Sequence, residues 1–366
     1  MTLSSFFCPQ SSAWAWFLIA FVLFAGVTTA MLAWAAVFRV AQARWAASVN
    51  RIAQSAIYFT PFSVLVLLPV LVGVRCCAPW AGHPVPGKEA WLNVPFFVIR
   101  EIVCLGALWT LCFLMVRWSL NADAKSARGE PITHRDHHRL NAISVAVIMV
   151  YCVVSSVVAY DFIMSLDPEW VSTMFAPYFF CTNLYAGMAV MILLAAALRR
   201  GLGAEKHLGP SQFHDMGNLL LAFSLFDMGL FFAQYLTIWY GNLPEETPFL
   251  VLRYYRGPWP WLGWTAFILG YAIPFLFLQS RRLKQNPRWL APVAVLALVG
   301  FALERYVLIV PSLQPDKLLL FHPHSVVVIL LFVLFIYTTL RFFKLYSPVS
   351  AADAALAEMK PAEEQV

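Results

Sequence analysis

The stretch AWAWFLIAFVLFAGVTTAMLAWAAVF, residues 13–38, contains no charged side chain. A helix that crosses a bilayer needs roughly 20 consecutive apolar residues, so this stretch is long enough to span a membrane. It does not alternate apolar and polar residues, as a membrane β-barrel strand does. It also lacks a basic n-region and is too long for the apolar core of a signal peptide. The stretch therefore predicts a retained transmembrane helix.

Eight further apolar segments of the same character follow along the chain. The nine predicted spans cover residues 13–38, 55–74, 91–116, 141–162, 171–198, 216–240, 261–279, 289–310 and 325–340. We therefore predict an all-α polytopic membrane protein. Its membrane domain covers residues 13–345, between a short N-terminal segment at 1–12 and a polar tail at 346–366.

The composition excludes a soluble enzyme with a conventional cleft. Of the 366 residues, 61% are hydrophobic and only 12% are charged, against about 45–50% and about a quarter in soluble domains. The net charge is +6. We interpret the basic residues as setting the orientation of the protein in the membrane rather than as binding nucleic acid, because 18 of the 25 Lys and Arg residues fall in alternate connections or the C-terminal tail. Basic connections stay in the cytoplasm. This predicts a bacterial inner-membrane protein with a periplasmic N-terminus and a cytoplasmic C-terminus.

Signals for a bound cofactor are missing from the sequence. A CxxC pair is the usual sign of a zinc or iron–sulfur site. The seven cysteines form no such pair. None of the eight histidines lies in the middle of a predicted helix, as axial haem ligands in a bundle would. The run HRDHH at 134–138 matches no standard zinc spacing and is interpreted as a basic surface. Phosphate-binding and dinucleotide fingerprints are also missing. We predict that this chain binds no metal.

A few ionisable or polar residues interrupt the apolar segments. Charge at membrane depth costs several kcal/mol and marks a functional site by default. One interpretation is a polar chain, open to the outside, for proton exchange or for a quinone headgroup. The other is structural: pairs that lock helices together, or caps at helix ends. The candidates are Arg100, Glu101, Asp161, His214, Asp215, Asp227, Gln234, Glu304 and Arg305.

Asp227 is the candidate for which the functional interpretation is favoured. It lies near the centre of the sixth predicted helix, roughly 20 Å from either end at 1.5 Å per residue. No basic residue of its own helix can neutralise it. Asp161 and the His214–Asp215 pair lie near helix ends instead, where interfacial or capping roles are favoured.

The predicted outer connections are acidic. SLDPEW at 165–170 carries Asp167 and Glu169, and GNLPEET at 241–247 carries Glu245 and Glu246. Asp–Pro and Leu–Pro steps stiffen such loops. They could dock a periplasmic partner or simply cap helices, and both interpretations stay open. His322 and His324, just before the ninth helix, are further docking candidates.

Several motifs together carry a family resemblance over residues 13–345. They are DFIMSLDPEW at 161–170, STMFAPYFF at 172–180, HDMGNLL at 214–220, FAQYLTIWYGNLPEET at 232–247 and FHPH at 321–324. In this order and spacing the chain resembles the ActF-type membrane subunit of alternative complex III, a bacterial quinol:cytochrome c (or oxidase) oxidoreductase. Such subunits are related to the NrfD and polysulphide-reductase membrane proteins.

The resemblance implies a fold of two four-helix bundles plus flanking helices. It implies a subunit that holds no cofactor, although contact with quinone or quinol is compatible with it. The electrons would pass to iron–sulfur clusters and c-type haems on partner subunits. These partners would be an NrfD-like sister subunit, an iron–sulfur protein, a multihaem cytochrome c and a terminal oxidase. The surrounding membrane lipid completes the predicted partners, and nucleic acid is excluded.

Two features depart from the family pattern. Ten helices are usual and nine are predicted here, so that one N-terminal helix is expected to be missing. Asp227 also falls where the pattern predicts an aromatic residue, so its role rests on depth and chemistry. The predicted function is a subunit that supports the quinol-oxidising subunit and contributes to proton translocation or quinone contact.

Two rival functions remain at this point. One is a purely structural anchor for periplasmic redox modules. The other is an independent secondary transporter, whose helices are usually broken by Gly or Pro at matched positions. Pro69 and Pro274 form only a weak pair of that kind.

Overall fold

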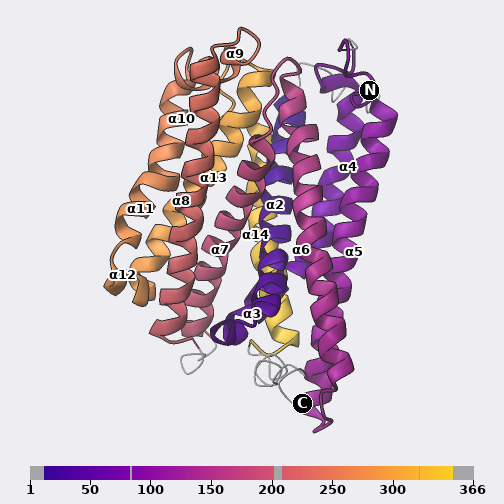
Figure 1. Cartoon of the computed structure of the whole chain (residues 1–366), viewed down its shortest axis with the longest axis vertical. Helices are drawn as coiled ribbons and strands as arrows, with labels where there is room; N and C mark the ends of the chain where they lie inside the picture. Colours follow the sequence, from indigo (N-terminus) through magenta and orange to yellow (C-terminus); the bar gives the residue numbers. More distant parts are fainter. Residues whose placement is uncertain (1–11, 83–84, 202–207, 321, 349–366) are drawn as a thin grey trace.

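The computed structural model describes residues 12–82, 85–201, 208–320 and 322–348. These residues form helices and contain no strand. Nine of the described helical spans are long and apolar enough to cross a membrane, in the predicted order (Figure 1). Most of them extend beyond the predicted range, and the third covers Val94–Ala127 with 34 residues.

The spans form two four-helix bundles and a flanking helix, the arrangement that the resemblance implied. The first bundle consists of α2 (Ser12–Val40), α4 (Thr60–Cys77), α5 (Val94–Ala127) and α6 (His134–Phe162). The second consists of α7 (Phe175–Gly201), α8 (Pro210–Gly241), the seventh span and α13 (Pro287–Leu313). The seventh span is made of α10 (Trp259–Phe267), the π-helix η5 (Ile268–Ala272) and α11 (Ile273–Leu278). The flanking helix is α14 (Val326–Leu345), which packs on α2 and on the second span.

Helix α2 is the member of the first bundle that also packs against the second, and 78% of its most apolar window is buried (Figure 1). It packs against helices of both bundles, α7 and α6 above all. Small residues permit this close approach. A Cβ on Gly26 would lie 2.7 Å from Asn183 Oδ1, and one on Gly187 of α7 would lie 3.1 Å from the Ala30 Cβ. The first span is therefore the element that joins the bundles.

The second span is broken near one end and begins earlier than predicted. It starts with α3 (Ala47–Gln54), passes through the 3₁₀-helix η2 (Ser55–Phe59) and continues as α4. Arg51, assigned to a connection at first, is therefore inside the span and fully buried. Its guanidinium pairs with Asp123 and donates to Gln54 Oε1 at 2.7 Å. A charge-paired arginine is tolerated at this depth, and hydropathy alone does not reveal the pairing.

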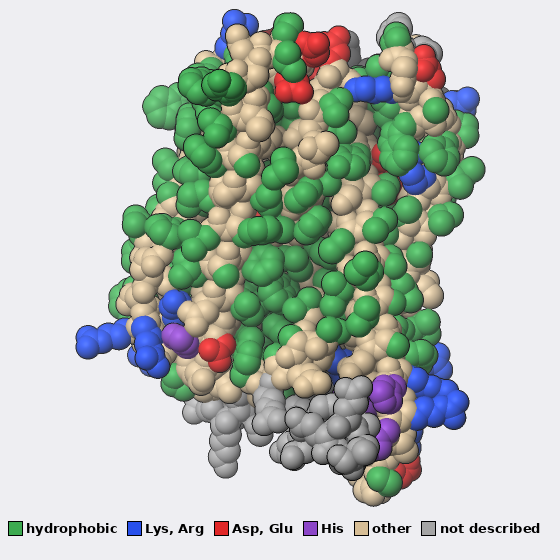
Figure 2. All heavy atoms as spheres, in the orientation of Figure 1, with side chains coloured by type: hydrophobic (Ala, Val, Ile, Leu, Met, Phe, Trp, Pro, Cys, Tyr) green, Lys and Arg blue, Asp and Glu red, His purple; other side chains and the backbone are tan. Residues whose placement is uncertain are grey.

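Charged side chains gather at the two ends of the molecule, with a hydrophobic belt between them (Figure 2). The end where α2 begins is called the upper end, and the opposite end is called the lower end. The short helix α9 (Thr247–Tyr254) lies at the upper end, and α12 (Arg281–Gln285) lies at the lower end (Figure 1). The remaining short turns are η1 (Arg44–Ala46), η3 (Met164–Leu166) and η6 (Pro323–Ser325).

Local sequence signals explain where several spans begin. Thr133 and Asp136 form a capping box at the start of α6, in which each side chain accepts from the other residue's backbone N–H. Asn93 accepts from the Phe96 N–H at the start of α5 at 3.0 Å. Such caps satisfy backbone donors that have no partner within the helix.

Candidate functional site

An ion pair joins α5 to α6 near the upper end. Arg100 places Nε 2.7 Å and Nη2 2.6 Å from Asp161 Oδ2. The Trp91 indole donates to the other oxygen, Oδ1, at 2.9 Å, and its ring lies 3.8 Å from the guanidinium carbon of Arg100. Asp161 is therefore fully engaged and buried, rather than interfacial as its position near a helix end suggested.

Glu101 completes this group, which we call the upper cluster (Trp91, Arg100, Glu101 and Asp161). Its side chain is 0% exposed, and neither carboxyl oxygen accepts a hydrogen bond from a described residue. The charges that act on it are those of Asp161 and Arg100. The cluster thus holds two carboxyls and one guanidinium, so that a single proton makes it neutral.

A second group lies in the other bundle. Arg305 Nη1 donates to Glu304 Oε1 at 3.0 Å, and Arg305 Nη2 donates to Asn183 Oδ1 at 3.1 Å. The other Glu304 oxygen, Oε2, accepts from the Tyr271 hydroxyl at 2.8 Å. Arg305 is 0% exposed. Side chains of α7, α13 and the π-helix η5 therefore meet around one buried glutamate–arginine pair.

Asp227 on α8 belongs to the same group, which we call the central cluster (Asn183, Asp227, Tyr271, Glu304 and Arg305). Its side chain is 0% exposed, and neither oxygen accepts a hydrogen bond from a described residue. The charges of Glu304 and Arg305 act on it. The charge count repeats that of the upper cluster: two carboxyls share one guanidinium, and one proton makes the group neutral.

The π-helix shapes the central cluster. At η5 a closely packed crossing brings Gly270 against Gly300 of α13, so that a Cβ on Gly300 would lie 2.1 Å from the Gly270 Cα. The Tyr185 hydroxyl donates to the Gly270 carbonyl at 2.6 Å. The Tyr185 ring stacks on Tyr271, with centroids 5.6 Å apart. Short π-helical turns are frequent at functional sites, and this one places Tyr271 against Glu304.

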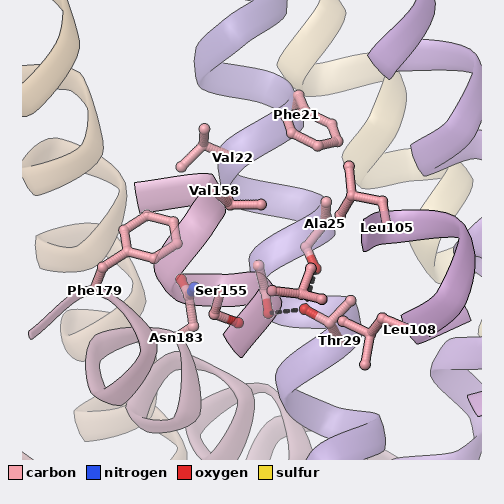
Figure 3. Close-up of a pocket in the computed structure, with 12 residues that line it drawn as sticks. Phe21, Val22, Ala25, Thr29, Leu105, Leu108, Ser155, Val158, Phe179 and Asn183 are labelled. Atoms are coloured by element: carbon pink, nitrogen blue, oxygen red, sulfur yellow. Dashed lines mark hydrogen bonds between the residues drawn. The ribbon is translucent and has the colours of Figure 1, made fainter. Parts of the chain in front are cut away.

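A small cavity lies at the junction of the two bundles (Figure 3). Its polar lining comes from Thr29, Ser155 and Asn183, and its apolar lining includes Leu105 and Val158. Leu105 follows Glu101 by one helical turn, and Asn183 is the partner of Arg305. The volume of about 20 Å³ is enough for one water molecule. The cavity therefore lies between the two clusters.

A second recess of the same size borders the central cluster from the α8–α10 side. Glu304, Tyr271 and Tyr178 line it together with aromatic side chains, among them Phe231 and Phe267. Gly263 and Ala266 of α10 also line this recess. Glu304 is therefore in contact with a recess lined by aromatic rings.

The other predicted site residues lie apart from both clusters. Gln234 is buried on α8, above Asp227. His214 and Asp215 lie at the lower end, where the His214 Nδ1 is 3.5 Å from the Asp215 carboxylate. Glu169 is exposed, and so is Glu245.

The remaining upper-end candidates have local partners or are partly covered. Asp167 lies below the surface, and burial raises the pKa of its carboxyl while the nearby Arg253 lowers it. His322 Nε2 is 2.7 Å from the Ser12 hydroxyl. Glu246 and His324 are both partly buried.

Sequence reasoning missed several residues of the two clusters and their surroundings. Tyr271 and Asn183 are polar groups in apolar helices and gave a weak signal that was not used. Arg253, buried on α9, donates to the Phe249 and Leu308 carbonyls at 2.9 Å. It was counted among the connections, where its pairing with backbone carbonyls could not be foreseen.

Comparison with known proteins places the chain in a family. A family model described as polysulphide reductase, NrfD, matches residues 5–315. The chain belongs to the NrfD family. NrfD proteins are membrane subunits, typically of quinone-interacting redox complexes, and they partner with iron–sulfur and other redox subunits. No curated protein matches the chain. The NrfD fold here thus carries two buried clusters, one in each bundle.

Proposed function

We propose that this NrfD protein is the ActF-type subunit of a quinol-oxidising complex of the alternative complex III type, in the bacterial inner membrane. The motifs at 161–180 and 232–247 support this assignment. The subunit itself holds no cofactor. It supports an NrfD-like sister subunit that oxidises quinol, while an iron–sulfur protein and a multihaem cytochrome c carry the electrons onward, beside a terminal oxidase.

The orientation of the proposal follows the distribution of charge. The lower end bears most of the Lys and Arg residues and is assigned to the cytoplasm. The upper end, with α9 and the acidic connections, is then periplasmic. The upper cluster lies near this periplasmic end, and Asp227 of the central cluster lies near the middle of α8.

The central cluster is proposed to hold and release a proton. The observation that carries this proposal is that Asp227 is buried with both oxygens lacking a donor. Burying an ionised carboxylate without a partner is so costly that the group binds a proton instead. Glu304 keeps Arg305 and Tyr271 as donors and is therefore the carboxyl suited to carry the negative charge. Two carboxyls share one proton in this cluster. The proton can therefore move from one carboxyl to the other while the Arg305 guanidinium still compensates the remaining negative charge.

The upper cluster repeats this arrangement closer to the periplasmic side. Arg100 engages Asp161, and Glu101 is the carboxyl without a donor. The cavity between the clusters, with room for one water, supplies the polar contact between them at Asn183 and Ser155. Proton movement would follow the order central cluster, cavity, upper cluster and periplasm.

The test is the exchange Asp227→Asn in the assembled complex. We expect quinol-driven electron transfer or proton release to fall at least several-fold, because an amide cannot donate and take back a proton. Asp215→Asn, on the same helix but partly exposed at its lower end, is the matched control and should leave both rates near those of the wild type. Unchanged turnover together with an unchanged proton-to-electron ratio in the Asp227→Asn complex would refute the proton role.

A second candidate function is the purely structural anchor. The Arg100–Asp161 pair favours it, because this pair joins two neighbouring helices whether or not a proton moves. Neutralising Glu245 and Glu246 would then lower the amount of haem and iron–sulfur subunits that co-purify, while Asp227→Asn would leave turnover intact. A chain that is active when expressed alone would instead indicate a transporter.

A further inference from the structure

A group of basic side chains surrounds α12 at the lower end, where the seventh span ends. Arg281, Arg282 and Arg288 are exposed, and Lys284 is buried between them. The helix α12 packs against α8 and α13. We call these four residues the α12 basic group. Lys and Arg side chains are visible at this lower corner of the molecule in Figure 2.

Among the residues that the structure describes, no carboxylate forms an ion pair with the α12 basic group. The sequence contains no Asp or Glu between Glu246 and Glu304, and no ion pair between described residues includes any of the four. The hairpin between α5 and α6 is different, although it is also basic. There Lys125 lies 3.0 Å from Asp136, and Arg128 lies 2.7 Å from Glu130.

Lys284 adds a cation whose hydrogen-bond partner among the described residues is a neutral group. Its ammonium donates to Asn218 Oδ1 at 2.7 Å. Its stem lies against α8 so closely that a Cβ on Gly217 would be 2.9 Å from the Lys284 Cγ. Burial lowers the pKa of this ammonium. A nearby anion would offset that cost, since it favours the charged form.

Apolar side chains continue from the basic group into the belt. Leu276 and Phe277 on α11 are 68% and 46% exposed, and Trp289 at the start of α13 is 59% exposed. Trp is typical of the membrane interface, where its ring lies at headgroup level. The surface thus offers cations at the level of a phosphate and an apolar strip at the level of acyl chains.

We propose that the α12 basic group binds the headgroup phosphate of an anionic phospholipid. Guanidinium groups donate two parallel hydrogen bonds to phosphate oxygens, and basic pockets at helix ends bind anionic headgroups. A zwitterionic lipid carries its own cation, which the three unpaired arginines would repel. The selectivity therefore arises because no described carboxylate pairs with these arginines. This site is independent of the function proposed above.

The test measures lipid binding to the full chain by native mass spectrometry and in nanodiscs. Phosphatidylglycerol is titrated into phosphatidylcholine, with the wild type and Arg281→Gln/Arg282→Gln compared. About 1 kcal/mol per basic residue near the surface corresponds to about fivefold in affinity. We therefore expect the double variant to bind phosphatidylglycerol roughly twentyfold or more weakly, with unchanged thermal stability in phosphatidylcholine alone.

The matched control is Lys125→Gln/Arg128→Gln, which removes the same charge from the carboxylate-paired hairpin. We expect it to change the affinity less than threefold or so, on the order expected for one screened surface charge. Equal losses in both variants, or no loss in the α12 variant, would overturn the site. Inorganic phosphate lacks the acyl chains that fill the apolar strip. If millimolar inorganic phosphate displaces phosphatidylglycerol completely, the proposal that the ligand is a lipid is wrong.

Discussion

Replacing Asp161 by Asn should destabilise the first bundle strongly. The exchange removes the carboxylate that Arg100 pairs with among the described residues, and the side chains of this pair are 7% and 0% exposed. Removing one partner of such a buried pair costs about 3–5 kcal/mol when the remaining charge is left without compensation. An Asn oxygen still accepts from Trp91, and Glu101 is a second carboxyl beside Arg100, so we expect the lower value, about 3 kcal/mol. That is more than a hundredfold in the folded-to-unfolded ratio.

The assay is equilibrium unfolding of the purified chain in mixed micelles with increasing SDS. Glu130→Gln is the control. Arg128 Nε lies 2.7 Å from Glu130 Oε1, a distance similar to that in the buried pair, but these two side chains are 61% and 50% exposed. Exposed pairs contribute below about 1 kcal/mol. If Asp161→Asn unfolds within about 0.5 kcal/mol of the control, the reasoning from burial is wrong. A double-mutant cycle with Arg100→Gln then measures the coupling directly.

Two further outcomes follow from the packing and from the upper end. Gly300→Ala should destabilise the chain by about 1–3 kcal/mol or more, because its Cβ would lie 2.1 Å from the Gly270 Cα; an unfolding midpoint equal to that of the wild type would contradict this crossing. Burial raises the pKa of Asp167 above its unfolded value of about 3.9, so its stability contribution is complete below about pH 4 and is lost as the pH rises through the folded pKa. Asp167→Asn should therefore show a smaller drop in thermal midpoint between pH 4 and pH 7 than the wild type. An identical drop in both proteins would refute the raised pKa of Asp167 in the folded state.

Hydropathy predicted the number and order of the spans because each one is a continuous run of apolar residues. The limits of the spans were less accurate where helices extend past the membrane or carry compensated charge. Arg51 is the clearest case: its guanidinium ended the predicted second span, whereas Asp123 on α5 and Gln54 compensate it inside the fold. A single sequence does not show that a charge has a partner on another helix.

The candidate site was predicted residue by residue but not as two groups. Arg100, Glu101 and Asp161 stood out because they are ionisable at membrane depth, and so did Asp227, Glu304 and Arg305. Their division into clusters depends on which helices face each other. The π-helix at 268–272, where Gly270 meets Gly300, was also not predicted. Pro274 is a local signal for it, because proline lacks the N–H that would bond to the Gly270 carbonyl.

The central place of α2 has a consequence for biogenesis. This span leaves the ribosome ahead of the other described spans, yet α13 and α14, two of the helices that enclose it, are made last. During synthesis it must therefore wait in lipid with its future interface uncovered. It is suited to do so, because Arg39 near its end is its only charged residue. Completion of the fold then requires later helices to displace lipid from a span already inserted, so that α2 is fully enclosed only when α13 and α14 have been made.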